Sequence, residues 1–236
     1  MASLPWINHS WHVALYISPT GLTTMSLPYK DLNLQIDFDF TKHQLRLSTS
    51  NGDLRHFDLH GLSVADFYQK TMAMLKELKI GLHIITIPNE IENPIPFEQD
   101  FIHATYDVEV VIAFHQALLI TQDVFVQFGS NFKGKCSPIH LYWGSFDVAF
   151  SLFSGLPAPK HPGGIPGLPD WVAQEAYSHE LCSCGFWPGN DMFPEAAFYS
   201  YCYPEPVGYK KAAIKPSEAY YHQTHGEYIL PYAAVQ

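Results

Sequence analysis

The sequence has few charged residues, and the acidic ones outnumber the basic ones. Only 15% of its 236 residues are charged, and 13 Lys and Arg against 23 Asp and Glu give a net charge of −10. No run of basic residues occurs beyond the pair Lys210-Lys211. A protein that binds nucleic acid needs a basic surface to neutralise phosphates, so we expect no nucleic-acid partner.

Signals for export and for membrane insertion are also missing. Residues 1–20 lack the basic start and the apolar segment of a signal peptide. We find no apolar run long enough to predict a membrane span. The four cysteines do not have the spacing of a zinc site, so we interpret them as reduced thiols. These features predict a cytoplasmic protein with no membrane partner.

The widespread catalytic motifs are absent too. The sequence contains no G-x-S-x-G motif, no P-loop and no Gly-rich dinucleotide motif, so nothing favours a serine hydrolase, a kinase or a Rossmann dehydrogenase. The metal patterns H-x-H and H-E-x-x-H do not occur either.

Aromatic residues, in contrast, are abundant. The chain has 47% hydrophobic residues and contains 14 Tyr, 16 Phe and 5 Trp. This is enough apolar material for a sizeable core and more aromatic residues than a small core needs. We therefore expect some of them to line a small-molecule cleft or the interface of a homo-oligomer.

The pattern of apolar residues predicts an α+β fold, mostly antiparallel sheet with two principal helices. Helices are predicted over 63–80 and 108–128, where apolar residues recur every three or four positions. Alternating segments and turn residues, including Asn51-Gly52, predict strands over 11–17, 22–28, 34–40, 44–50, 54–59, 81–87, 138–143, 175–184, 197–203 and a hairpin over 220–230.

We expect a single domain over residues 1–236. The polar, proline-broken loop at 89–102 is a possible border between two packed halves. In that case residues 1–88 form a meander with one helix, and residues 103–236 form the second helix with a C-terminal sheet.

The best candidate site is centred on residues 134–155. In the predicted strand Pro138–Trp143, His140 and Tyr142 share one face. Asp147 follows among apolar neighbours, and a buried carboxylate needs a partner because an unpaired buried charge is costly. A purely structural interpretation is a hydrogen-bonded core histidine and an aspartate bonded to backbone amides.

We predict that His140 and His179 lie on neighbouring strands and face a common cleft, with Asp147, Tyr201 or His12 nearby. A histidine in an apolar strand needs partners for its ring nitrogens, and another polar strand residue is the readiest one. The candidate catalytic residues are His140, Asp147, His179 and Tyr201. The candidate ligand-binding residues are His12, His103, Trp143, Tyr177, Glu180 and Trp187.

Three kinds of chemistry fit these residues. His140 and His179 with a carboxylate would suit zinc or iron(II). A His–Asp or His–Tyr pair in an aromatic pocket would suit metal-free acid–base catalysis of a small molecule. The same groups would also orient a bound small molecule without any reaction, as in a binding or assembly protein.

Several sequence blocks resemble an uncharacterised bacterial family, a domain of unknown function. The resemblance runs end to end and includes the blocks NHSWHVALY, IPF-x-x-D-x-x-HA-x-YD, GK-x-SP-x-H-x-x-WGSFD, EAYSHE and GFWPG. It lends weight, without assigning roles, to His9, His12, His103, Asp107, His140, Trp143, Asp147, His179 and Glu180. Members of that family usually have a longer arm before Asn8 and an arginine where this chain has Leu152. The resemblance implies that such an arginine is a candidate counter-ion for Asp147 or for a substrate.

Overall fold

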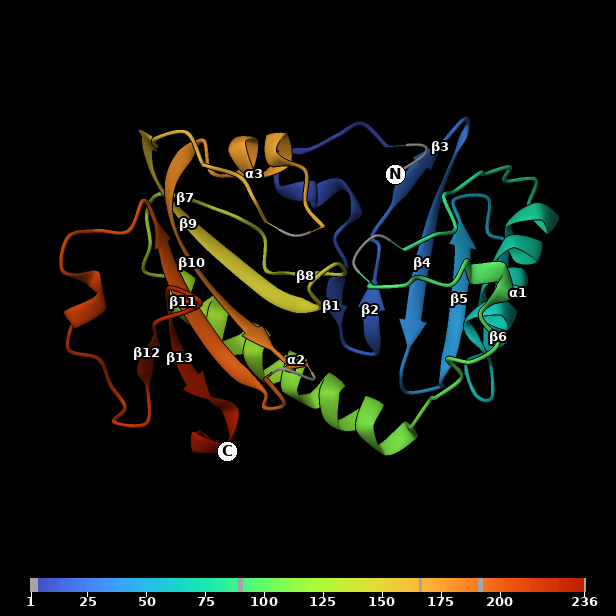
Figure 1. Ribbon diagram of the computed structural model, residues 1–236. Coiled ribbons are helices and arrows are strands. Elements are labelled where there is room, and N and C mark those ends of the chain that lie inside the picture. Colours follow the sequence, from blue (N-terminus) through green and yellow to red (C-terminus); the bar gives the residue numbers. More distant parts are fainter. Residues whose placement is uncertain (1–3, 89–90, 166, 191–192, 236) are drawn as a thin grey trace. The chain divides into compact units, whose positions relative to one another are not determined.

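The computed structural model of the chain describes residues 4–88, 91–165, 167–190 and 193–235 (Figure 1). The chain divides into two compact units, Met1–Leu119 and Ile120–Gln236, and the border lies inside helix α2 (Val108–Gly129). Each unit contains one antiparallel sheet, so the predicted α+β class is confirmed.

The N-terminal unit contains a six-stranded sheet with the order β1-β2-β4-β5-β6, and β3 pairs with β4. The predicted strands at 34–40, 44–50 and 54–59 are confirmed as β4, β5 and β6. Gly52 turns the β5–β6 hairpin with a φ of 87°, a conformation that glycine adopts readily. The strands are β1 (Tyr16–Ser18), β2 (Gly21–Thr23), β3 (Leu27–Tyr29), β4 (Leu32–Asp39), β5 (Gln44–Thr49) and β6 (Leu54–Asp58).

Helix α1 (Val64–Glu77) packs against one face of this sheet. Ser63 and Asp66 form the predicted capping box, in which each side chain bonds to the other residue's backbone N–H. The buried core between helix and sheet consists of Leu34, Leu45, Leu47, Leu59, Met74, Leu75 and Ile80.

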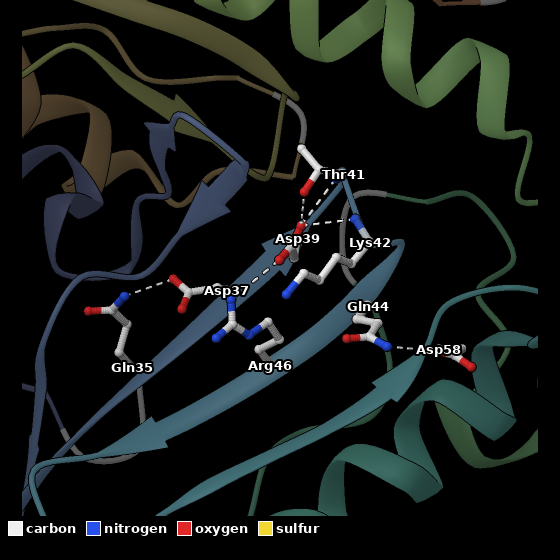
Figure 2. A network of polar contacts seen from close by, with 8 residues as sticks. All are labelled: Gln35, Asp37, Asp39, Thr41, Lys42, Gln44, Arg46 and Asp58. Carbon is white, nitrogen blue, oxygen red and sulfur yellow. Dashed lines mark hydrogen bonds and ion pairs between the residues drawn. The ribbon is translucent and has the colours of Figure 1, made fainter. Parts of the chain in front are cut away.

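The other face of this sheet is polar, and Asp39 is its most buried member (Figure 2). The Asp39 carboxylate accepts hydrogen bonds from the Thr41 N–H at 3.1 Å, the Thr41 hydroxyl at 2.7 Å and the Lys42 N–H at 3.0 Å. Arg46 adds an ion pair at 3.3 Å. Burial alone would raise the pKa of Asp39, but these bonds outweigh it and hold the pKa below its ordinary value. This network closes the β4–β5 turn.

Three predicted strands of this unit are wrong in part or completely. Instead of a strand from residue 11, a 3-10 helix, η1 (Asn8–Val13), precedes β1, because His9 and Ser10 have φ angles of 63° and 58°. The segment 22–28 is split at Met25, which also has a positive φ. Residues 81–88 form no strand, and their backbone bonds to the Tyr29 hydroxyl and to the Phe97 N–H instead of to a ladder.

The C-terminal unit contains a seven-stranded sheet with the order β12-β13-β11-β10-β9-β7, and β8 pairs with β9 (Figure 1). The predicted strand 197–203 and the hairpin over 220–230 are confirmed. The strands are β7 (Lys135–Cys136), β8 (His140–Tyr142), β9 (Asp147–Pro157), β10 (His179–Trp187), β11 (Ala197–Tyr203), β12 (Tyr220–His222) and β13 (Glu227–Pro231).

Two elements of this unit differ from the prediction. The 11-residue strand β9 was not predicted, although it pairs with β7, β8 and β10. The strand predicted over 175–184 begins only at His179, because residues 170–176 form helix α3 (Asp170–Ala176), and it continues through Gly185 to Trp187.

Helix α2 begins as predicted, with the Asp107 carboxylate accepting bonds from the N–H groups of Glu109 and Val110. Its C-terminal part packs on the second sheet, where the Phe125 ring lies 6.2 Å from Phe150 and 6.3 Å from Phe198. By length and composition alone α2 could cross a membrane, so the statement that no apolar run is long enough was wrong. A core helix of a soluble protein has the same composition but is mostly buried, whereas 28% of the apolar window of α2 is buried. Leu118 and Phe125 are among its buried residues.

Candidate functional site

The two faces of the C-terminal sheet carry different side chains. Phe150 of β9 faces α2, so Asp147 and Ser151 point to the other side, because side chains alternate along a strand. The polar side continues across the neighbouring strands, because Ser151 lies opposite Ser183 and Ser183 lies opposite Tyr201. We call this side the tyrosine face. Its polar members are His140, Asp147, Ser151, Ser183, Tyr199, Tyr201, Tyr203 and Glu227, with Tyr177 bonded to Tyr201.

Asp147 is buried at the start of β9, with 8% of its surface exposed. Its two carboxylate oxygens accept hydrogen bonds from different hydroxyl groups: Ser145 donates to one, and Tyr199 donates to the other at 2.5 Å. Bonds to a charged acceptor are short and strong. The side-chain partner predicted for Asp147 is therefore present, and it consists of hydroxyl groups.

A chain of hydroxyl groups continues from Tyr199 across the sheet. The Tyr199 ring stacks on Tyr201 at 6.1 Å, and the hydroxyls of Tyr201 and Tyr177 lie 2.9 Å apart. Ser183 is the cross-strand partner of Tyr201, and its hydroxyl lies 3.0 Å from that of Ser151. Burial raises the pKa of Tyr199 and of Tyr201 well above the ordinary value. Both side chains are therefore neutral hydrogen-bond donors at physiological pH.

Gly185 gives the Tyr199 ring its place over β10. The two residues are cross-strand partners, and a Cβ atom added at Gly185 would lie 2.2 Å from Tyr199 Cζ. No side chain other than glycine leaves room for this ring.

Glu227 is the second carboxyl group of the tyrosine face. It lies two residues before Ile229, which is opposite Tyr199, so it shares that face. Its side chain is half-buried, and burial followed by the negative charge of Asp147 raises its pKa to about 7. Among the residues that the structure describes, neither carboxyl group forms an ion pair with a lysine or an arginine. A proton, rather than a cation, therefore relieves the repulsion between them.

His140 is buried next to this network. Its Nδ1–H donates to the Pro138 carbonyl at 2.9 Å, and its Cα partner in β9 is Ala149. Burial lowers the pKa of His140, although the bond to Pro138 and the charge of Asp147 act in the opposite direction. The ring is therefore neutral at physiological pH.

The predicted common cleft of His140 and His179 is wrong. Their strands β8 and β10 lie on opposite sides of β9 and do not pair with each other. His140 is opposite Ala149 and His179 is opposite Pro157, eight positions further along β9, which corresponds to roughly 26 Å. His179 is exposed, and its Nδ1 lies 3.1 Å from the Ser178 hydroxyl.

Among the other predicted site residues of this unit, Tyr177 and Tyr201 belong to the same network as Asp147. Trp187 also lies on the tyrosine face. It follows Phe186, the partner of Val148, and is therefore level with Asp147. Its ring stacks on Phe193 at 5.7 Å. Glu180 and Trp143 lie elsewhere. Glu180 accepts a bond from Ser154 at 2.9 Å, and Trp143 is partly exposed in the turn after β8.

His12 and His103 belong to the N-terminal unit and have local partners there. The His12 ring accepts a bond from the Ile7 N–H at 3.3 Å and lies edge-on to Trp6. Burial, followed by the charge of the N-terminus, lowers its pKa. His103 is largely exposed, and its Nδ1 lies 2.8 Å from an Asp100 carboxylate oxygen.

Tyr199 and Glu227 are the residues that the sequence analysis missed. The alternation of side chains along the predicted strands could have identified both. Tyr199 shares a face with Tyr201 in the predicted strand 197–203, and Glu227 alternates with Ile229 in the predicted hairpin.

The predicted metal site finds no ligand set. In the described part of the chain, no group of three or more His, Cys, Asp or Glu side chains is arranged to hold a metal ion. The two predicted zinc or iron ligands, His140 and His179, lie opposite residues of β9 that are eight positions apart, so they cannot bind one metal ion together.

The fold and the site together define an α+β protein with two helix-backed antiparallel sheets, one of which has a partly buried network of tyrosines and carboxyl groups. The chain belongs to a family of unknown function (DUF5996), whose model matches residues 1–236. The resemblance to an uncharacterised family is thereby confirmed. No curated protein and no solved structure matches the chain.

Proposed function

We propose that this chain is a cytoplasmic enzyme that acts on a small molecule at the tyrosine face by general acid–base catalysis. Asp147 serves as the base and Glu227 as the acid. The observation that supports this proposal most strongly is the placement of two carboxyl groups on one partly buried, aromatic face, where neither pairs with a lysine or an arginine of the described chain.

The two carboxyl groups differ in their surroundings, as the groups of an acid–base pair must. Asp147 accepts two hydroxyl hydrogen bonds, which stabilise its anion. Glu227, with a pKa of about 7, is protonated in a large fraction of molecules at neutral pH. A general acid works best when its pKa lies near the operating pH. Tyr201 and Tyr177 would orient the substrate through their neutral hydroxyl groups.

The metal-assisted version of this function has no geometric support, because its two histidine ligands are far apart. Free cysteines at all four positions agree with a reducing compartment such as the cytoplasm. The proposal therefore assigns the chemistry to the chain's own carboxyl and hydroxyl groups.

A comparison of metabolite profiles tests the proposal. The purified chain is incubated with a bacterial metabolite extract, and small molecules are quantified by mass spectrometry over time. The parallel sample contains the double variant Asp147→Asn, Glu227→Gln, which keeps the size of both side chains. The matched control is Glu218→Gln, an exposed glutamate of the same unit.

We expect at least one compound to be consumed by the wild type and by the control, and not by the double variant. A compound that raises the melting temperature of the wild type without being consumed would instead establish a binding protein. Equal consumption by the wild type and the double variant would contradict the assignment of the two carboxyl groups.

An assembly function is the second candidate, and α2 carries the observation that favours it. Ile120, Val124 and Phe128 follow one another at intervals of four residues, and each is about half exposed. Such spacing places the three side chains in one row on the helix surface. An exposed apolar row is typical of protein interfaces.

Sedimentation equilibrium of the wild type and of Val124→Glu tests this candidate. An oligomer that the substitution dissociates would support assembly through α2, with Asp123→Asn, an exposed substitution one residue away, as the control. A monomeric wild type at micromolar concentration would exclude self-assembly through this row.

A further inference from the structure

We propose that Cys182 and Cys202 are an oxidative modification site, at which the two thiols form a reversible cross-strand disulfide. The proposal is independent of the enzymatic function and goes beyond it. It concerns the side of the C-terminal sheet opposite the tyrosine face.

Strand pairing brings the two cysteines together. Cys182 of β10 and Cys202 of β11 are direct partners in the antiparallel register, so their side chains lie next to each other on the same face of the sheet. Opposite residues in such a ladder have Cα atoms about 4.5 to 5.5 Å apart, which lies inside the range of about 4.4 to 6.8 Å that a disulfide spans. The bond would therefore form without movement of the backbone. Both side chains are only half-buried, so a small oxidant has access.

The other two cysteines have no such partner. Cys184 is opposite Ser200, and its thiol donates to the Phe150 carbonyl at 3.6 Å. Cys136 is exposed on β7, where its partner is Leu152. The four cysteines therefore contain one pair in bonding position and two single thiols.

The reaction balances with a peroxide as the oxidant. The Cys182 thiolate attacks one oxygen of hydrogen peroxide, the O–O bond breaks, and the hydroxide that leaves takes up a proton to give water. Cys182 is now a sulfenic acid. The Cys202 sulfur then attacks the Cys182 sulfur, the S–O bond breaks, and a second water leaves. The two thiols lose two electrons and two protons, and the peroxide is reduced to two water molecules.

The surroundings of Cys202 favour this order of steps. Burial, followed by the neighbouring Cys182 thiol, raises the pKa of the Cys202 thiol to about 12, while the Tyr209 hydroxyl acts in the opposite direction. A thiol held in this state is a poor attacking group for peroxide, because the thiolate is the nucleophile. Cys182 is therefore assigned the first attack and Cys202 the resolving role.

The position of the pair links it to the tyrosine face. Ser183 and Tyr201 form the next pair in the same ladder, and their side chains point to the opposite side of the sheet. A disulfide between Cys182 and Cys202 would fix β10 against β11 directly beside the pair of Ser183 and Tyr201.

Peptide mapping of the oxidised full chain tests the proposal. The native protein is treated with hydrogen peroxide, and free thiols are blocked by alkylation. Proteolysis after Glu180 and Glu195 then places Cys202 in a different peptide from Cys182 and Cys184. Cys184→Ser is the matched control, because it removes the nearest other thiol, and Cys202→Ser removes the resolving thiol.

We expect the number of free thiols in the wild type and in Cys184→Ser to fall by two, and the two peptides to be joined. Dithiothreitol should separate the peptides, and a second treatment with peroxide should join them again. In Cys202→Ser, Cys182 should stop at the sulfenic acid, detected with dimedone. A cross-link that requires Cys184 or Cys136 would overturn the proposal. Four remaining thiols in the wild type, under conditions that oxidise an equal concentration of dithiothreitol, would overturn it as well.

Discussion

On the tyrosine face, the position of each carboxyl group in the sheet decides which groups surround it. Asp147 accepts hydrogen bonds from Ser145 and Tyr199. Glu227 lies two residues before Ile229, the partner of Tyr199, and burial followed by the negative charge of Asp147 raises its pKa to about 7. Two carboxyl groups on one face of the sheet therefore have different surroundings, which is what the proposed acid–base pair requires.

The wild type should lose stability as the pH rises through 7, and replacement of Glu227 by glutamine should remove this loss. This carboxyl titrates near 4.5 in the unfolded chain and at about 7 in the folded chain. The folded-state pKa is raised, so the stability from this group is complete below pH 4.5 and is lost as the pH rises through 7. Solvent screens the half-exposed group, so we expect Glu227→Gln to exceed the wild type by only about 1–2 kcal/mol at pH 8, and by nothing near pH 4. Urea unfolding across this pH range measures the difference.

Removal of the Tyr199 hydroxyl should destabilise the protein more than removal of the Tyr203 hydroxyl. Tyr199 donates to a buried carboxylate, and such a bond contributes about 1.5–3 kcal/mol. Tyr203 lies on the same strand but donates to the Pro159 carbonyl, a neutral bond worth about 1 kcal/mol. Urea unfolding of Tyr199→Phe and Tyr203→Phe at pH 7 compares the two losses. Equal losses would show that the bond from Tyr199 to Asp147 contributes no more than the neutral bond of Tyr203.

Leu152 shows how strand alternation decides which charges can meet. It lies on the α2 side of β9, opposite Cys182, whereas Asp147 and Ser151 lie on the tyrosine face. An arginine at position 152 would therefore extend from the other side of the sheet. It would not serve as the counter-ion of Asp147.

Among the helices and strands, the sequence predicts the ones that have one apolar face and one polar face. The helix α1 has its capping box, and β4 and β11 alternate over their full length, so their pattern identifies them. The strand β9 alternates too, but its tyrosine face carries the small residues Ala149 and Ser151, and Gly155 interrupts it. The pattern of β9 is therefore weak, although β9 is central in the sheet.

The missed strand also explains which part of the site could be predicted. Asp147, Tyr177 and Tyr201 were selected for their polar groups in apolar strands. Tyr199 connects them, because it donates to Asp147 and stacks on Tyr201, whose hydroxyl lies 2.9 Å from that of Tyr177. The pairing of His140 with His179 failed because β9 lies between their strands, and the register depends on pairings that a single sequence does not specify. Polar residues that share a face could be selected from the sequence, but their neighbours across the sheet could not.

A methyl group at Gly185 should disrupt the site through the packing of β10 on β11. The added Cβ would overlap the Tyr199 ring, which would have to leave its position and lose its bond to Asp147. Overpacking of this kind costs about 1–3 kcal/mol before the lost hydrogen bond is counted. Gly81→Ala is the control, because the nearest atom to its new Cβ is the Tyr29 hydroxyl at 3.9 Å. Urea unfolding should separate the two variants, and a tolerated Gly185→Ala would mean that the Tyr199 ring has another place to go.

At the scale of the whole molecule, both units follow the same plan. Each sheet packs one face on a helix and has polar side chains on the other, with Asp39 buried in the first unit and Asp147 in the second. The helix α2 runs through the border between the units. Its His115 ring donates to the Ser18 carbonyl in the first unit, and its Phe125 packs on Phe150 in the second. One continuous helix therefore supplies buried side chains to both.

This shared helix predicts that the two units unfold together. We expect one transition in differential scanning calorimetry, with equal calorimetric and van't Hoff enthalpies. Ile120 lies at the border and is 55% exposed, so its substitution removes little core. Ile120→Pro should break the helix there at a cost of about 3 kcal/mol or more, and should separate the single transition into two. Ile120→Ala keeps the helix and should retain one transition close to that of the wild type. Two transitions already present in the wild type would show that α2 does not couple the units.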